Sequence, residues 1–290
     1  TILVTAASGQ LGRLVIAALL ARGAAPAEIV ASARDTSKLT DVAARGIRTV
    51  ELDYARPETI APALDGVDTL LLISGSELGN RVAQHRNVID AAKAAGVAKL
   101  VYTSAPQVST ADFVLAPEHK ATEEAIAAAG IPAVIVRNNW YTENYAADVA
   151  RSASTGVIAS SAGDGRVASA TRADLAEGAA VVLLEDGHVG EVYEFAGDEA
   201  WSFADLADAA SHVVGRPVTY APMSTDEHVA ALEGAGLDAG TAGFVAGIDD
   251  GIRRGVLDVP TGTLSRLIGR PTTSLVDGLR SAVERVRDAA

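Results

Sequence analysis

Residues 2–12 read Ile2-Leu3-Val4-Thr5-Ala6-Ala7-Ser8-Gly9-Gln10-Leu11-Gly12, an apolar run that leads into a turn of small residues and then into a helical pattern. Such a strand-turn-helix presents the unpaired N–H groups and the positive dipole end of its helix to an anion. Gly9 lets the backbone approach a pyrophosphate, and Gly12 lets the helix pack closely on the strand. The stretch therefore predicts a dinucleotide-binding turn.

Ala6 departs from this pattern, because the G-x-x-G-x-x-G variant of the motif has its first glycine at that position. If the position requires a positive φ, alanine costs roughly 1 kcal/mol there, and the binding mode can survive that cost. A glycine motif alone is weak evidence, so a strand-turn-helix without a ligand is the alternative interpretation.

The next apolar run, Ile29–Ala33, ends at Arg34, where a site for NAD usually has an acidic residue that binds the ribose 2′-hydroxyl. A guanidinium can instead bind a 2′-phosphate with two hydrogen bonds, and Lys38 follows one helical turn later. The two cations predict a preference for NADP(H) over NAD(H), although Asp35 beside them argues against it. The alternative is a solvated arginine in a loop.

Short apolar runs alternate with helical patterns through the first half of the chain, over residues 2–5, 29–33, 48–52, 69–73, 100–104 and 133–136. This alternation predicts an α/β fold with a doubly wound, Rossmann-like parallel sheet. Helices are expected over about 80–95 and 118–129, ending at the glycines Gly96 and Gly130. Residues 105–117, with two prolines, are expected to be either a mobile lid or a plain surface loop.

We expect an NADP-binding Rossmann domain over 1–150 and a composite region over 151–290, with strands near 157–158, 167–170, 192–195 and 218–220. Residues 171–184 are expected to pack back on the Rossmann domain. Residues 203–214 and the later helices are expected to form a smaller α/β lobe on the substrate side. The Ala- and Gly-rich stretch 234–247 is a candidate flexible segment.

Composition limits the function classes. The formal net charge of −13 disfavours nucleic-acid binding, and five scattered histidines with no cysteine predict neither a metal site nor a disulfide. No apolar run has transmembrane length and the first strand begins at once, so the expectation is a soluble, cytoplasmic protein that does not bind a membrane. A homodimer stays open, because no motif supports one.

Several further blocks carry a family resemblance: Leu71-Leu72-Ile73-Ser74-Gly75-Ser76-Glu77, Gln84-His85-Arg86-Asn87-Val88-Ile89, Arg137-Asn138-Asn139-Trp140-Tyr141-Thr142-Glu143-Asn144-Tyr145, Ala162-Gly163-Asp164-Gly165, Ala168-Ser169-Ala170-Thr171-Arg172-Ala173-Asp174 and Leu267-Ile268-Gly269. With the opening turn, they resemble the NmrA-like atypical short-chain dehydrogenase/reductases, and within them the type 2 NAD(P)H:quinone oxidoreductases. The resemblance runs along nearly the whole chain, and the Arg137–Tyr145 block is its most specific part.

The resemblance implies that NADPH is the cofactor and that a hydride passes to a quinone without flavin or metal. The pyrophosphate would lie at residues 9–11, the 2′-phosphate at Arg34, and the block 138–143 beside the nicotinamide, with Arg172 close by. The expected cofactor residues are Ala6, Ser8, Gly9, Gln10, Leu11, Gly12, Arg34, Lys38, Ile73, Ser74, Gly75, Asn138, Asn139, Trp140, Tyr141, Thr142, Glu143 and Ser169. Trp140, Tyr141 and Phe244 would border a flat quinone cleft, unless they are core aromatics.

Simple alcohol dehydrogenation is disfavoured, because the Tyr-x-x-x-Lys pair of alcohol-forming short-chain reductases is missing: Leu115 and His119 stand in its place, and Lys120 faces a different direction on its helix. A quinone needs no strong general acid, since the hydroquinone anion is already stabilised. Tyr141 is the first candidate partner for the quinone oxygen, and His119 and Ser104 are weaker ones; His119 could also be an ordinary polar residue near a helix start. Reduction of a triphenylmethane dye, an NADP-binding redox sensor and a structural NAD-binding subunit are the alternatives.

Overall fold

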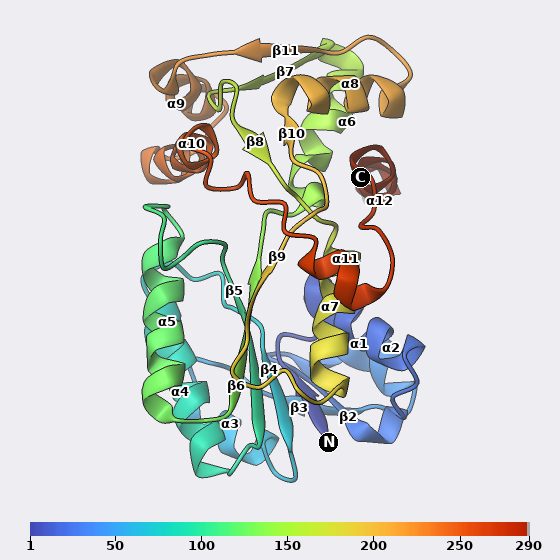
Figure 1. Cartoon of the computed structure of the whole chain (residues 1–290), viewed down its shortest axis with the longest axis vertical. Helices are drawn as coiled ribbons and strands as arrows, with labels where there is room; N and C mark the ends of the chain where they lie inside the picture. The colour runs from blue at the N-terminus through green and yellow to red at the C-terminus, as the bar shows by residue number, and fades with distance from the viewer. Residues whose placement is uncertain (289–290) are drawn as a thin grey trace. The chain divides into compact units, whose positions relative to one another are not determined.

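A computed structural model describes residues 1–288, which form two compact units (Figure 1). Unit 1 comprises Thr1–Ser109, Pro117–Asn138 and Arg172–Phe195. Unit 2 comprises Thr110–Ala116, Asn139–Thr171 and the chain from Ala196 on. Each unit is therefore assembled from separate stretches of the sequence.

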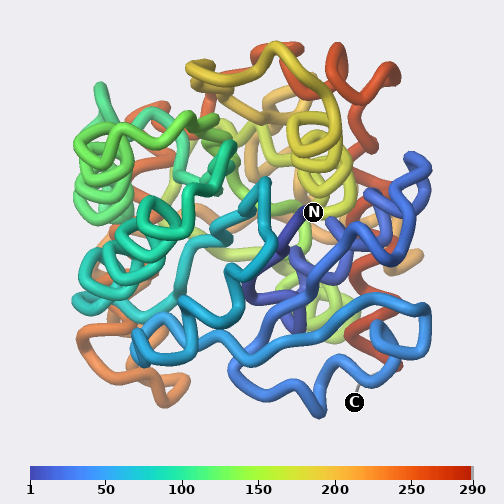
Figure 2. The backbone as a smooth tube through the Cα atoms, turned by 90° about the horizontal axis from the view of Figure 1, so that it is seen from below, coloured from blue at the N-terminus to red at the C-terminus, as the bar shows by residue number. Residues whose placement is uncertain are grey.

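Unit 1 is built on one parallel sheet of seven strands in the order β3-β2-β1-β4-β5-β6-β9. The strands are β1 (Ile2–Val4), β2 (Ile29–Ala33), β3 (Arg48–Glu51), β4 (Thr69–Leu72), β5 (Lys99–Ser104), β6 (Ala133–Asn138) and β9 (Val192–Phe195). The chain starts at β1, in the interior of the sheet, and the direction of winding reverses between β1 and β4 (Figure 2). The predicted doubly wound, Rossmann-like sheet is confirmed.

Helices cover both faces of this sheet (Figure 1). One face carries α1 (Gln10–Ala21) and α7 (Arg172–Leu184), which pack on each other, and the other carries α3 (Pro57–Ala63), α4 (Arg81–Ala94) and α5 (Ala116–Ala129). Short turns η1 (Pro26–Glu28), η2 (Thr36–Leu39) and α2 (Thr40–Ala43) lie near β2 and β3. Because both faces are covered, consecutive residues of a central strand are all buried, as in Leu70–Leu72.

Unit 2 is a smaller α/β assembly with two short two-stranded sheets, one pairing β7 (Val157–Ser160) with β11 (Thr219–Pro222) in parallel and the other pairing β8 (Arg166–Val167) with β10 (Trp201–Ser202) antiparallel. Its helices are η3 (Thr142–Tyr145), α6 (Ala146–Thr155), α8 (Phe203–Val214), α9 (Thr225–Gly234), α10 (Ala239–Arg253), α11 (Thr263–Ile268) and α12 (Leu275–Asp288). The helices α6, α8 and α12 pack on one another.

The units divide the chain at other points than residue 150. Unit 2 begins its second stretch at Asn139 and also takes residues 110–116, while residues 172–195 return to unit 1, where α7 packs on α1. That one unit binds the cofactor and the other the substrate stays a prediction, as does a mobile lid over 105–117, a segment of turns that ends at the start of α5.

The stretch 234–247 is helical from Ala239 on, so the expectation of a flexible segment is wrong there. The Asp238 carboxylate caps α10 by accepting from the Thr241 N–H at 3.0 Å, and Ala242 and Ala246 are buried. Among residues 1–288, no helix combines the length and hydropathy needed to cross a membrane.

Candidate functional site

The turn after β1 has the backbone that its sequence predicts. Ala6 has a φ of 47°, so the position does require the left-handed conformation that glycine adopts at least cost. A Cβ built on Gly12 would lie 2.6 Å from the Ala6 carbonyl oxygen and 2.7 Å from the Ala7 Cα. Gly12 is therefore the residue that lets α1 begin directly against the turn.

The first turn of α1 is open toward an anion. Gly9 is its N-cap, and within residues 1–288 no side chain accepts a hydrogen bond from this helix start. Gly9 and Gln10 are exposed. The Gly9 N–H itself donates to the Ala6 carbonyl at 2.9 Å, so the N–H groups open to a ligand are those that follow it. With a helix dipole behind them they fit a pyrophosphate, which supports Gln10 and Leu11 as cofactor residues, while Ser8 and Gly9 stay predictions.

A hydroxyl network joins the carboxyl ends of the strands at the point where the winding reverses. The Tyr54 hydroxyl donates to the Ile73 carbonyl at 2.8 Å and lies 2.5 Å from the Thr5 hydroxyl. Thr5 Oγ1 in turn donates to the Leu71 carbonyl and accepts from the Ile73 N–H, both at 2.9 Å. Sequence reasoning missed Thr5, which follows directly on β1, and Tyr54, which lies three residues after the end of β3. Polar residues near the carboxyl ends of the strands are candidates for the ligand site in this fold.

In the loop after β4, two backbone N–H groups donate hydrogen bonds to side chains of neighbouring elements, which fixes the loop. The Ser74 N–H donates to Thr103 Oγ1 at 2.9 Å and the Gly75 N–H donates to His85 Nε2 at 2.9 Å. Burial lowers the pKa of His85 to about 4, so the ring is neutral and able to accept this bond. The backbone N–H groups of Ile73, Ser74 and Gly75 are already bonded within the protein, so they are not available as hydrogen-bond donors to a cofactor.

Arg34 lies at the carboxyl end of β2 with its side chain 72% exposed, and its Nη1 pairs with Glu77 Oε1 at 3.2 Å. Lys38 is exposed on η2. The Asp35 carboxylate caps η2 by accepting from the Ser37 N–H at 3.0 Å and the Ser37 hydroxyl at 2.6 Å, which lowers its pKa. Asp35 therefore caps the local turn, and its carboxylate stays charged next to Arg34, so the argument from Asp35 against a phosphate at Arg34 still stands.

The two weaker catalytic candidates, Ser104 and His119, are both hydrogen-bonded inside unit 1. The Ser104 hydroxyl donates to Glu123 at 2.6 Å, and Glu123 is paired with Arg137 at 2.7 Å. His119 is 5% exposed and its Nδ1 lies 2.8 Å from the Tyr102 hydroxyl. Burial lowers the pKa of His119 to about 3, so it carries no proton to donate as an imidazolium near neutral pH. Lys120 is exposed, as its place on the helix predicts.

Asn138, the last residue of β6, is 7% exposed, and its Oδ1 is buried without a hydrogen-bond partner among the described residues. A buried acceptor left unpaired costs on the order of 1–3 kcal/mol, so such an atom at the carboxyl edge of the sheet favours a bound donor. Asn138 thus fits the expected place of a cofactor residue.

In unit 2, Asn139, Thr142 and Ser169 are brought together by backbone pairing, because Tyr141 bridges to Ala170 and the Thr142 N–H donates to the Ala170 carbonyl at 3.1 Å. Their polar atoms serve this unit: Asn139 Nδ2 donates to the Leu257 carbonyl at 3.2 Å, and Ser169 Oγ lies 2.8 Å from Thr142 Oγ1. This network fixes the backbone of the block 139–143.

The aromatic residues of the block separate into two kinds. Trp140 and Tyr141 are half-buried, whereas Tyr145 is buried with its ring 4.9 Å from Trp201 and 5.8 Å from Phe203, so Tyr145 belongs to the core of unit 2. Phe244 lies half-buried on α10. The quinone cleft of Trp140, Tyr141 and Phe244 stays a prediction, as do the cofactor roles of half-buried Glu143 and of Arg172, the first residue of α7.

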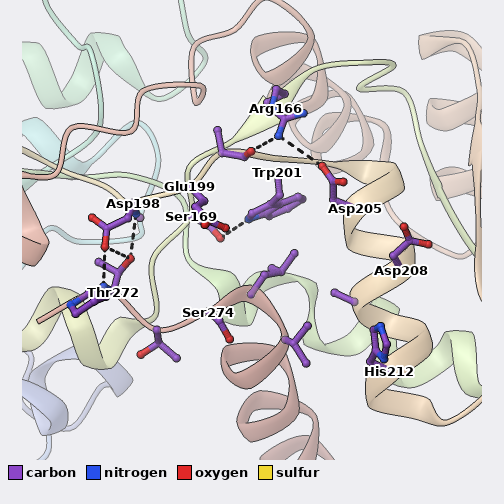
Figure 3. A pocket seen from close by; sticks show the side chains of 17 residues that line it. Arg166, Ser169, Asp198, Glu199, Trp201, Asp205, Asp208, His212, Thr272 and Ser274 are labelled. Atoms are coloured by element: carbon purple, nitrogen blue, oxygen red, sulfur yellow. Dashed lines mark hydrogen bonds and ion pairs between the residues drawn. The ribbon is translucent and has the colours of Figure 1, made fainter.

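Unit 2 also contains a cavity of about 540 Å³ between α8 and residues 271–276, with Ser169 and Trp201 in its wall (Figure 3). Its lining includes the carboxylates Asp198, Glu199, Asp205 and Asp208. Arg166 also lines it, but pairs with Asp205 at 3.5 Å and donates to the Ala200 carbonyl. The Trp201 indole N–H donates to Ser169 at 2.9 Å. This acidic lining would repel phosphates, so the cavity does not fit a pyrophosphate.

The chain is similar to known NAD(P)H-binding proteins over nearly its whole length. A family described as NAD(P)H-binding matches residues 6–186. Quinone oxidoreductase 2 of Escherichia coli (strain K12) is 46% identical over 278 residues, which cover 96% of this chain and 97% of that protein.

Among residues 1–288, no group of three or more His, Asp or Glu side chains is arranged to hold a metal ion.

Two solved structures agree closely with this one. The NADPH-dependent quinone oxidoreductase from Escherichia coli, complexed with NADPH, aligns with a TM-score of 0.93 at 45% identity, covering 97% of this chain and 99% of that chain. The triphenylmethane reductase of Citrobacter sp., complexed with NADP(H), aligns with a TM-score of 0.92 at 36% identity, covering 97% and 100%.

Proposed function

Because this chain belongs to the NAD(P)H-binding family that matches residues 6–186, we propose that it is an NADPH-dependent quinone oxidoreductase. The observation that carries the proposal is its similarity to quinone oxidoreductase 2, at 46% identity over nearly the full length of both chains. The resemblance to NmrA-like reductases of the type 2 quinone oxidoreductase group is thereby confirmed.

NADPH, when bound, supplies a hydride from its nicotinamide. The residues of unit 1 would hold the cofactor: the free N–H groups at the start of α1 bind the pyrophosphate, and Arg34 binds the 2′-phosphate. Asn138 Oδ1, a buried acceptor without a protein donor among the described residues, is available to the carboxamide N–H₂ group of the nicotinamide. These contacts position and orient, which is the main task left to a protein when the cofactor carries the chemistry.

The acceptor side would be served by Trp140 and Tyr141, which are half-buried and stand on a backbone fixed by the pairing with Ala170. The Tyr141 hydroxyl is the proposed hydrogen-bond donor to a quinone oxygen. A strong acid is not required, because a hydroquinone anion can take its proton from water. The neutral, buried state of His119 is consistent with such a reaction.

A second acceptor class has its own support. The Citrobacter triphenylmethane reductase shares the fold at 36% identity over nearly the whole chain, and a cationic dye accepts a hydride without any proton. Reduction of a triphenylmethane dye is therefore the alternative function. A cytoplasmic location and the absence of nucleic-acid partners stay predictions, and a homodimer stays open.

The proposal is tested by following NADPH oxidation through the absorbance of the reduced nicotinamide, with benzoquinone, naphthoquinone and a triphenylmethane dye as acceptors and NADH as the control cofactor. We expect quinone-dependent turnover that favours NADPH. The variant Arg34→Ala should weaken NADPH about tenfold or more and leave NADH nearly unchanged. Equal losses for both cofactors would reject the 2′-phosphate assignment.

The outcome also separates the alternatives. Turnover with the dye and none with quinones would replace the proposed acceptor. Binding of NADPH without oxidation by any acceptor would replace the enzyme with an NADP-binding redox sensor, and the search would move to protein partners.

A further inference from the structure

Arg34 is the proposed anchor of the 2′-phosphate, yet it already has a partner. Its Nη1 lies 3.2 Å from Glu77 Oε1, and both side chains are largely exposed, at 72% and 48%. An ion pair this exposed contributes little to stability, because water screens it. What the pair does instead is occupy the guanidinium with a carboxylate, which is also an anion.

Glu77 is not free to swing away from that position. Its second oxygen, Oε2, accepts from Gln84 Nε2 at 2.7 Å, and Gln84 is a buried residue of α4. The loop that carries Glu77 is tied on both sides, since Arg81 Nε donates to the Gly75 carbonyl at 2.7 Å and the Gly79 N–H donates to Glu118 at 2.7 Å. The carboxylate is thus held beside Arg34 by the loop and the helix together.

We propose that Glu77 is a specificity-determining residue that competes with the 2′-phosphate of NADP(H) for Arg34 and so restrains the preference for NADP(H) over NAD(H). This inference rests on the proposed function, since it presumes that Arg34 meets the phosphate. A phosphate near neutral pH carries close to two negative charges, and it must displace the Glu77 carboxylate and then tolerate it nearby. The 2′-hydroxyl of NAD(H) is uncharged and is not repelled by a carboxylate. Glu77 therefore weakens the binding of NADP(H) and leaves the binding of NAD(H) unaffected.

The variant Glu77→Gln tests this, because it removes the charge while its side-chain oxygen still accepts from Gln84. By calorimetric titration, we expect NADP⁺ and the fragment 2′,5′-ADP to bind about tenfold more tightly, with NAD⁺ and 5′-AMP unchanged. The matched control is Glu58→Gln, which removes the same charge from an acid that pairs with Arg56. The control should leave all four affinities as they are.

A second variant tests the anchor. Gln84→Met removes the amide that holds Glu77 without changing the formal charge, and we expect it to give part of the gain in NADP⁺ affinity, about threefold. The proposal is overturned if Glu77→Gln leaves the ratio of NADP⁺ to NAD⁺ affinity unchanged, or shifts it by no more than the Glu58→Gln control does.

These readouts are binding constants, so they separate this inference from the proposed function. A changed affinity ratio without quinone turnover supports Glu77 and rejects the quinone acceptor. Normal turnover with an unchanged ratio rejects Glu77 alone, and a wild-type protein that binds neither nucleotide rejects both.

Discussion

At the scale of single residues, Ala6 shows most clearly how a local rule of sequence becomes a feature of structure. Alanine stands where the motif has glycine, and its φ of 47° shows that the turn keeps the glycine conformation in spite of the side chain. An L-residue pays for the left-handed region because its Cβ crowds the following carbonyl. The strain lies in the segment that would contact the pyrophosphate.

We therefore expect Ala6→Gly to raise the free energy of unfolding by up to about 1 kcal/mol, because it relieves the left-handed backbone. Urea unfolding followed by circular dichroism measures this change. Ala7→Gly, at a neighbouring position without a positive φ, should be destabilising, because glycine gains freedom in the unfolded chain. Loss of stability in both variants would show that Ala6 is unstrained.

Tyr141 and Tyr145 provide a matched pair for the acceptor side. Tyr141→Phe should lower kcat with a quinone about tenfold and leave the dissociation constant of NADPH unchanged, because it removes one hydrogen bond to the developing oxyanion. Tyr145→Phe should keep full activity and equal or exceed the wild-type melting temperature, since the Tyr145 hydroxyl is buried without a hydrogen-bond partner among residues 1–288.

Steady-state kinetics and a thermal melt of the two variants decide this. Activity of Tyr141→Phe equal to that of the wild type would remove Tyr141 from the mechanism. A loss of activity in Tyr145→Phe would mean that the core aromatic cluster matters to the reaction.

At the scale of elements, strands and helix ends could be predicted where a few neighbouring residues in the sequence are enough to identify them. The run Ile29–Ala33 is β2 with the expected bounds, because five consecutive buried residues need no partner to be identified as a covered strand. Gly96 and Gly130, expected at helix ends, have φ values of 71° and 70°. By contrast, α10 was missed, since its alanines and glycines give a weak periodic pattern and its cap depends on Asp238.

The same limit applies to the site. The glycine turn and Arg34 could be found, because each stands at a fixed spacing from a strand. Thr5 and Tyr54 could not be assigned roles, because their hydrogen bonds form only when the residues after β1, β3 and β4 come together. His85 could not be assigned a role either, because its bond to the Gly75 N–H depends on how α4 packs beside the loop after β4. Glu77 likewise becomes meaningful only once Arg34 is beside it.

The start of α1 depends on Gly12, and we expect Gly12→Ala to destabilise the fold by roughly 1–3 kcal/mol and to weaken NADP⁺ binding strongly. Its methyl group would lie 2.6 Å from the Ala6 carbonyl, so the helix start must move. The matched control is Gly243→Ala in α10, where the new Cβ would have no atom within 4 Å among residues 1–288 apart from the neighbouring backbone of its own helix, and helix propensity predicts a gain of about 1 kcal/mol. Chemical unfolding and nucleotide titration of both variants test this; normal NADP⁺ binding by Gly12→Ala would contradict it.

At the scale of the whole molecule, buried neutral histidines make stability depend on pH. The pKa of His85 is lowered to about 4 and that of His119 to about 3, both by burial, from an ordinary value of 6.5. Below pH 6.5 these two histidines bind protons in the unfolded chain but stay neutral in the folded protein. The free energy of unfolding therefore falls as the pH falls. This contribution is complete above pH 6.5 and declines until the folded rings also protonate.

We expect the variant His119→Asn to lose less stability than the wild type between about pH 6.5 and pH 4.5, by on the order of 2 kcal/mol. An asparagine oxygen can still accept from the Tyr102 hydroxyl, so the bond survives while the titrating group is gone. Urea unfolding across this range gives the comparison. Asp148 and Glu194, whose pKa values are raised by burial, act with the opposite sign in both proteins and cancel in the difference. Parallel curves would contradict the assignment.

Unit 1 is assembled from separate stretches of the chain, so part of its sheet stays incomplete during synthesis on the ribosome. Strand β9 pairs with β6 from Ile135↔Val192 to Asn138↔Phe195, so after Asn138 a further 54 residues (192 − 138) must be synthesised before the first residue of β9 exists to fill that edge. At about 5–20 residues per second, the nascent chain exposes the open edge of β6 for roughly 3–10 s. During that interval a bare, apolar strand is a target for chaperones and for pairing with neighbouring chains.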